Sequence, residues 1–183
     1  MGELVALARG QPGRLNYSAG STPFQVVAER FKQQNAISVN HIPYKGSAAA
    51  VAAVIANDAQ MTFVDSPPVV AHIKSGRLRG LAVTSRARAA VLPELPTMAQ
   101  AGMPDFEVVL WTSLFAPAAT PPAVIERLHQ QIAKVLQMAD VRERIASFGI
   151  DPGTAGPAEL GAILKADLAR WTAVSRSANI RAN

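Results

Sequence analysis

Strand-like and helix-like segments alternate over the first hundred residues, and this order constrains the fold more than any other feature of the chain. Short apolar runs predict strands at residues 14–18, 38–42, 59–64 and 78–84. Helical segments separate these strands, and a short helix over residues 3–9 precedes the first of them. Because strands and helices alternate, we expect an α/β fold with a mainly parallel sheet, flanking helices and right-handed crossovers.

Polar residues before each of these helices predict side-chain caps. Ser21 and Thr22 stand directly before Pro23, which predicts a hydroxyl N-cap followed by proline in the first turn. The turns at residues 44–47 and 65–68 predict caps for the next two helices in the same way. In the simplest interpretation, these polar residues do no more than begin their helices.

The chain follows a different pattern after about residue 100. A proline-punctuated connection leads to an extended stretch at 106–115, and amphipathic helices are predicted after residues 120 and 156, with a short helix near 141–148. The apolar stripes of the two longer helices must be buried against another surface. These stripes include Leu128, Ile132, Leu136, Leu164, Leu168 and Trp171. We therefore expect an α/β lobe over residues 1–100, and a crossover strand with C-terminal helices over residues 101–183.

Positive charge is concentrated in the first half of the chain. Residues 1–92 hold ten Lys or Arg against four acids, whereas residues 93–183 hold eight against nine. A basic half favours an anionic partner, such as nucleic acid, a membrane surface or a small organic anion. Aromatic residues are not interleaved with the basic ones and no helix-turn-helix pattern is present, so we expect no nucleic-acid partner.

The residue types argue against an enzyme and against a metal site. The chain contains no cysteine, and its three histidines lack partners at metal-ligand spacing. Phosphate-binding loops, a nucleophile elbow and paired acids in one loop are also missing. No apolar run approaches the roughly 20 residues of a membrane span, and the first nine residues lack the features of a signal peptide. We expect no catalytic residue, no metal and no cofactor.

The strand-to-helix turns are the candidate binding site, because the carboxyl ends of parallel strands share one edge of a sheet. Free N–H groups in the first turn of a helix, together with its dipole, favour a carboxylate or phosphate there. Lys45 adds a positive charge, whereas Asp65 would cap a helix or accept from a ligand. The candidate ligand-binding residues are Ser18, Ala19, Gly20, Ser21, Thr22, Tyr44, Lys45, Gly46, Asp65 and Ser66. A small Rossmann-like enzyme or regulator that binds a phosphorylated ligand is the alternative.

Several blocks of the sequence resemble one protein family. They read L-N-Y-S-A-G-S-T at residues 15–22, H-I-P-Y-K-G-S-A at 41–48, H-I-K-S-G-R-L-R at 72–79 and L-P-E-L-P-T at 92–97. In this order they are similar to the Bug/TctC family, the extracytoplasmic solute receptors of tripartite tricarboxylate transport. The resemblance covers essentially the whole chain, although the turn at residues 18–22 is shorter than the family pattern and has Ser21 where glycine is usual.

The resemblance implies a periplasmic binding protein of two α/β lobes. Such a receptor holds a small carboxylate (a di- or tricarboxylate, or an amino acid) and delivers it to a membrane permease. The resemblance also implies that the first-lobe segment is missing from this sequence, so that ligand binding would be weak or absent. If the 183 residues are the complete chain, we expect a cytoplasmic protein instead. The helices that would pack on a first lobe would be exposed, which favours a homo-oligomer.

Overall fold

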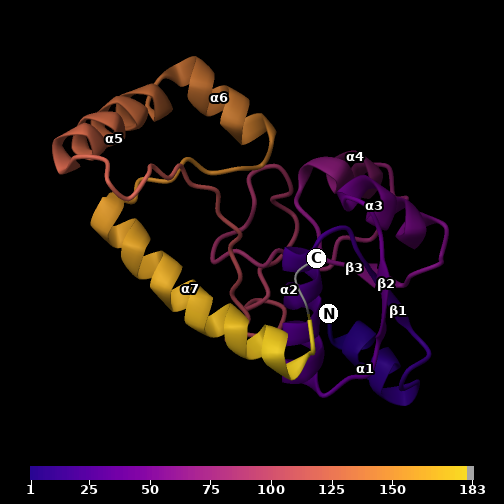
Figure 1. Ribbon diagram of the computed structural model, residues 1–183. Helices are drawn as coiled ribbons and strands as arrows, with labels where there is room; N and C mark the ends of the chain where they lie inside the picture. Colours follow the sequence, from indigo (N-terminus) through magenta and orange to yellow (C-terminus); the bar gives the residue numbers. More distant parts are fainter. Residues whose placement is uncertain (181–183) are drawn as a thin grey trace. The chain divides into compact units, whose positions relative to one another are not determined.

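The computed structural model describes residues 1–180, which form two compact units (Figure 1). The first unit contains Met1–Val109 together with the described residues from Ala173 onward, and the second contains Leu110–Thr172. The last three residues of the predicted 101–183 region lie outside the described part of the chain. Among the described helices, none combines the length and the apolar character needed to cross a membrane.

A parallel sheet organises the first unit. Its strands are β1 (Asn16–Ala19), β2 (Asn40–Pro43) and β3 (Met61–Thr62), in the spatial order β2-β1-β3. The central strand β1 pairs with both neighbours, which places Tyr17 opposite His41 on one side and opposite Met61 on the other. The predicted α/β class with a parallel sheet and flanking helices is therefore confirmed.

Helices cover both faces of this sheet. The first unit contains α1 (Gly2–Gly10), α2 (Thr22–Asn35), α3 (Ser47–Ile55) and α4 (Pro67–Lys74). Of these, α2 and α3 pack on the strands, and α4 packs on α3. The Tyr17 hydroxyl donates to the Glu29 carboxylate of α2, whereas the Ser18 hydroxyl donates to the carbonyl of Ala50 in α3. Because successive side chains of a strand point to opposite faces, α2 and α3 cover opposite faces of the sheet.

The fourth predicted strand, at residues 78–84, is wrong. Where it was expected, the described chain has one isolated parallel bridge between Val83 and Thr97. Two hydrogen bonds of 2.9 Å make this bridge, from the Val83 N–H to the Pro96 carbonyl and from the Met98 N–H to the Val83 carbonyl. Pro96 has no N–H to donate, so the ladder cannot continue on that side.

Aromatic rings fill the centre of the first unit. The Phe31 ring of α2 contacts the rings of Phe63 and Phe106, with centroids 5.5 and 5.9 Å apart. Arg30 donates to the carbonyl oxygens of the two residues that flank Phe106 and so fixes that ring in the core. The largest fully buried side chains are Tyr17, Phe31, Phe106, Met98 and Ser18.

The second unit is helical, and none of its described residues is buried. It contains α5 (Pro122–Leu136), α6 (Ala139–Ser147) and most of α7 (Pro157–Ser177), close to the three predicted helices. Apolar residues of the predicted stripes remain accessible, with exposed fractions of 49% for Leu128, 36% for Ile132 and 59% for Leu168.

The second unit has a polar contact between two of its segments and a cation–π contact at the end of α6. The Trp111 indole N–H donates to the Asp167 carboxylate at 2.8 Å, which joins the segment before α5 to α7. The Arg144 guanidinium lies 5.1 Å from the centre of the Phe148 ring in a cation–π contact. Such contacts are exposed to solvent and contribute little stability individually.

Candidate functional site

The turns after β1 and β2 are joined at the carboxyl edge of the sheet. The Tyr44 N–H donates to the Ala19 carbonyl, and the Gly46 N–H donates to the Gly20 carbonyl, both at 2.9 Å. The pairing of β1 with β2 therefore continues past both strands into the turns. As a result, the structure brings the first two groups of predicted site residues together.

The backbone of Gly20 lies so close to the backbone of Gly46 and Ser47 that no side chain fits at position 20. A Cβ added to Gly20 would lie 2.3 Å from the carbonyl carbon of Gly46 and 2.6 Å from the backbone nitrogen of Ser47. The turn after β1 is therefore in direct backbone contact with the beginning of α3. This close approach explains why glycine is required at position 20.

The turn after β3 is tied to the same edge by side-chain hydroxyls. Ser47 Oγ donates to Asp65 Oδ1 at 2.8 Å, and Thr62 Oγ1 donates to the Ser18 carbonyl at the same distance. The sequence does not predict either role, because its pattern indicates only a helix cap at Ser47 and nothing marks Thr62. The three strand-to-helix turns are thus linked to one another.

The predicted side-chain caps at this edge are wrong. The helices α2, α3 and α4 begin after Ser21, Gly46 and Ser66, and none of these residues makes a capping hydrogen bond with its side chain. Ser47 donates to Asp65 instead, and Ser66 already has helical backbone angles, which a capping residue does not adopt. The free first-turn N–H groups of α2 and α3 therefore lack side-chain partners within the described residues and can bind water or an anion. The N-terminus of α4 offers none, because Pro67 and Pro68 have no N–H and the Val69 N–H donates to the Ser66 carbonyl.

The predicted site residues divide into a buried and an accessible group. Ser18 and Ala19 are buried, and the Ser18 hydroxyl donates to the Ala50 carbonyl at 2.7 Å, so its role in this structure is to hold α3 on the sheet. The exposed members are Ser21, Lys45, Gly46 and Asp65, and the half-buried members are Gly20, Thr22, Tyr44 and Ser66. The accessible edge thus presents one cation, one carboxylate and the free N–H groups of two helix N-termini, those of α2 and α3.

A cluster of titratable side chains lies on the α2 face of the sheet. The Tyr17 hydroxyl and the Lys32 ammonium both donate to Glu29 Oε1 at 2.7 Å, and the His41 ring stacks on Tyr17 with centroids 4.9 Å apart. Burial raises the pKa of Tyr17, and the Glu29 carboxylate adds to this effect. Burial also lowers the pKa of His41, whose Nε2 is buried without a hydrogen-bond partner in the described structure. Tyr17 belongs to the core of the first unit, and the other three groups lie half-buried beside it.

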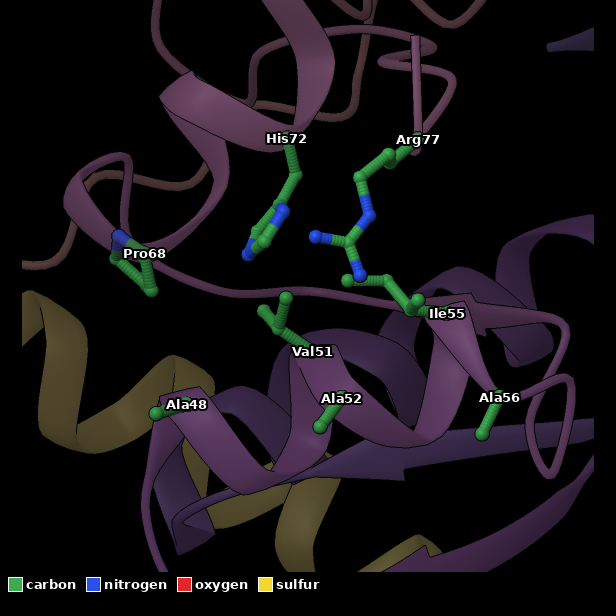
Figure 2. A pocket seen from close by; sticks show the side chains of 8 residues that line it. All are labelled: Ala48, Val51, Ala52, Ile55, Ala56, Pro68, His72 and Arg77. Atoms are coloured by element: carbon green, nitrogen blue, oxygen red, sulfur yellow. The ribbon is translucent and has the colours of Figure 1, made fainter. Parts of the chain in front are cut away.

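Other parts of the described chain offer a cavity but no metal site. No group of three or more His, Asp or Glu residues is placed to hold a metal ion within the described residues. A cavity of about 410 Å³ lies between α3 and α4 (Figure 2). None of the predicted site residues lines this cavity.

Comparison with known proteins relates this chain to one family. The family model described as the tripartite tricarboxylate transporter family receptor matches residues 1–180. A UPF0065 protein from Pseudomonas sp., encoded in a tcbD–tcbE intergenic region, is 34% identical over 99% of this chain and 55% of its own length. Protein BugT from Bordetella pertussis is 33% identical over 94% of this chain and 54% of its own length. The chain thus spans about half the length of these two relatives.

A solved structure agrees with this assignment. An R. palustris protein determined with adipate has a TM-score of 0.84 and 28% identity, covering 100% of this chain and 62% of that one. The family consists of transporter receptors rather than enzymes. On its match from residue 1 to residue 180, this chain belongs to the tripartite tricarboxylate transporter family receptors.

Proposed function

We propose that this chain binds a small organic carboxylate at the carboxyl edge of the sheet, as part of a solute receptor. The observation that supports this best is the meeting of the α2 and α3 N-termini, both without side-chain caps, at one edge. Their N–H groups and dipoles favour an anion, and the bonds that join the turns hold them in place. The related R. palustris protein determined with adipate supports a dicarboxylate as the ligand.

Two charged side chains at the edge act on such a ligand in opposite directions. Lys45 is exposed in the turn after β2 and attracts a carboxylate. Asp65 is also exposed and repels it, while its Oδ1 accepts the Ser47 hydroxyl. One side of a ligand on this open edge stays exposed to water, so we expect a dissociation constant on the order of millimolar.

Calorimetric titration of the full chain with adipate, succinate and citrate tests this proposal. Lys45→Gln should weaken binding several-fold, and Asp65→Asn should tighten it, because asparagine still accepts from Ser47 but carries no charge. Lys74→Gln, an exposed change in the last turn of α4, is the matched control and should leave the affinity unchanged. Absence of binding, or equal behaviour of Lys45→Gln and Lys74→Gln, would contradict the proposal.

The wider role of the chain follows from its family. We propose that residues 1–100 serve as the ligand lobe, and that a periplasmic receptor containing them delivers its ligand to a membrane permease. The buried core, whose last member along the sequence is Val108, supports a boundary in this part of the chain. Proteolysis of the folded chain tests the boundary, because cleavage within residues 1–100 before any cleavage in the following segment would contradict it.

We also propose that the exposed apolar residues of α5 and α7 promote self-association. Leu128 and Leu168 keep about half of their surface accessible, and exposed patches of this kind commonly mark interfaces. Sedimentation over a range of concentrations should show dimers or larger species, and Leu168→Glu should reduce them. A monomer of 19.3 kDa at every concentration would contradict self-association.

A further inference from the structure

The cavity between α3 and α4 is lined by apolar side chains on one side and by a cation on the other. Its volume of about 410 Å³ is within the range of small-molecule sites, roughly 300–1,000 Å³. The α3 side presents Ala48, Val51, Ala52, Ile55 and Ala56, and the opposite side presents Pro68, His72 and Arg77 (Figure 2).

The α3 side of the cavity is an uncovered apolar surface. Ala48, Ala52 and Ala56 are spaced four residues apart, so they share one face of the helix. All three are exposed, whereas Val51 beside them is buried. In the described chain, the methyl groups of these three alanines are therefore exposed to water. An apolar ligand that covered them would bind with a favourable hydrophobic free energy.

The end of α4 places a guanidinium at the mouth of this cavity. Gly76 has a φ of +72°, its N–H donates to the Ile73 carbonyl at 3.0 Å, and the Arg77 N–H donates to the His72 carbonyl at 2.9 Å. These two bonds form a Schellman motif, which turns the chain back at the helix end. Arg77 consequently extends beside the His72 ring, and both side chains point toward α3 (Figure 2).

No acidic residue lines the cavity, and no described carboxylate forms an ion pair with Arg77. The neighbouring Arg79, by contrast, lies 3.4 Å from the Glu3 carboxylate. The cavity thus combines an apolar floor with a cation that is available to an incoming anion.

We propose that this cavity binds an aliphatic monocarboxylate of medium chain length. Its tail lies on the alanine face of α3, its carboxylate pairs with the Arg77 guanidinium, and the His72 ring supplies a further N–H donor. A dicarboxylate does not suit the cavity, because its second charge would be left against methyl groups at a high desolvation cost. The ligand class therefore differs from the one proposed for the strand edge.

Methyl NMR of the full chain, titrated with butanoate, hexanoate and octanoate, tests the proposal. We expect saturable shifts of the α3 alanine methyls, with affinity rising by up to about fourfold for each added methylene. Octylamine, which carries the opposite charge on the same tail, should bind at least tenfold more weakly than octanoate.

Two variants separate the tail from the charge. Ala52→Leu fills the cavity from an exposed helix position and should abolish octanoate binding, and Arg77→Gln should weaken it about tenfold. Ala6→Leu on the exposed face of α1 and Arg79→Gln are the matched controls and should bind octanoate normally. Adipate binding should be the same in Ala52→Leu as in the parent chain, so failure at one site is distinguishable from failure at the other.

Three results would overturn the proposal. These are shifts that do not saturate, octylamine binding as strong as octanoate binding, and unchanged octanoate affinity in both Ala52→Leu and Arg77→Gln. Shifts of the same methyls that depend on protein concentration alone would instead assign the cavity to a second copy of the chain, and would also overturn it.

Discussion

The two units of this chain are folded by different means. In Met1–Val109, helices on both faces of the sheet bury side chains such as Phe31 to completion, whereas no described residue of Leu110–Thr172 is buried. Apart from Leu7, the large apolar side chains that remain clearly exposed lie between Val109 and Leu168. Because apolar burial is the main favourable term in folding, the first unit has its own source of stability and the second has much less.

This difference shows what amphipathic periodicity does and does not determine. The helices α2 and α5 both carry an apolar stripe, yet Val27 of α2 is 3% exposed while Leu128 of α5 is 49% exposed. The periodicity determines which face of a helix must be buried. It does not determine whether the surface that buries this face belongs to the same chain.

The largest effect should come from truncating one side chain in each unit. Phe31→Ala removes a fully buried ring and should lower the free energy of unfolding by about 3–5 kcal/mol. Leu128→Ala in α5 should change it by less than about 1 kcal/mol, because that side chain is half-exposed. Urea denaturation followed by circular dichroism measures both. Equal losses in the two variants would mean that α5 is covered in solution.

A methyl group added at a glycine should have opposite effects in the two units. Gly20→Ala places a Cβ against the backbone of Gly46 and should cost about 1–3 kcal/mol. Gly161→Ala in α7 meets no atom within 4 Å and should stabilise the helix by about 0.5–1 kcal/mol. Thermal unfolding compares them. A neutral Gly20→Ala would show that the crossing of the two turns can relax.

An effect smaller than that of Gly20→Ala is expected at the end of α2 in the first unit. Ala36 ends this helix with left-handed backbone angles, φ 50° and ψ 48°, which L-residues other than Asn and Asp adopt at a cost. Ala36→Gly should therefore raise the free energy of unfolding by about 0.5–1 kcal/mol. Ala56→Gly, at a right-handed helix end, is the control and should lower it by a similar amount.

The smallest expected effect is a dependence of stability on pH that arises in the first unit. Because burial lowers the pKa of His41 in the folded state, the unfolded chain takes up its proton first as the pH falls. This contribution to stability is complete above the ordinary histidine pKa of about 6.5 and is lost as the pH falls from there toward the folded-state value.

The variant His41→Phe isolates this titration. Phenylalanine keeps an aromatic ring beside Tyr17 but cannot bind a proton, so its urea midpoint should fall less on acidification than that of the parent chain. His129→Gln, in α5 of the second unit, should retain the parent slope. If His129→Gln flattens the slope and His41→Phe does not, the dependence comes from the second unit.

The parallel sheet and the meeting of the turns could be predicted because both follow from the alternation of strands and helices. The fourth strand could not, because its backbone bonds depend on which segment packs beside it. Val83 pairs with Pro96 and Met98, and a proline in that partner stops the ladder. Sequence periodicity indicates that a segment can form a strand, but it does not indicate which segment will pair with that strand.

The hydrogen bonds that link the turns could not be predicted from the sequence. The hydroxyls of Ser18 and Ser47 both bind groups distant in sequence, Ala50 and Asp65, so local rules for helix caps could not identify their partners. The cavity beside Arg77 was not predicted, because it exists only once α4 packs on α3. The unpredicted features are those that need tertiary contacts.

The hydrogen bond between Trp111 and Asp167 has a practical consequence for anyone who measures this protein. Both tryptophans, Trp111 and Trp171, belong to the second unit, and both tyrosines, Tyr17 and Tyr44, belong to the first. Tryptophan emission therefore records changes around α7 in the second unit, while tyrosine absorbance records the loss of the sheet. Each unit carries its own kind of chromophore, so a melting temperature has a meaning only together with the wavelength at which it was observed.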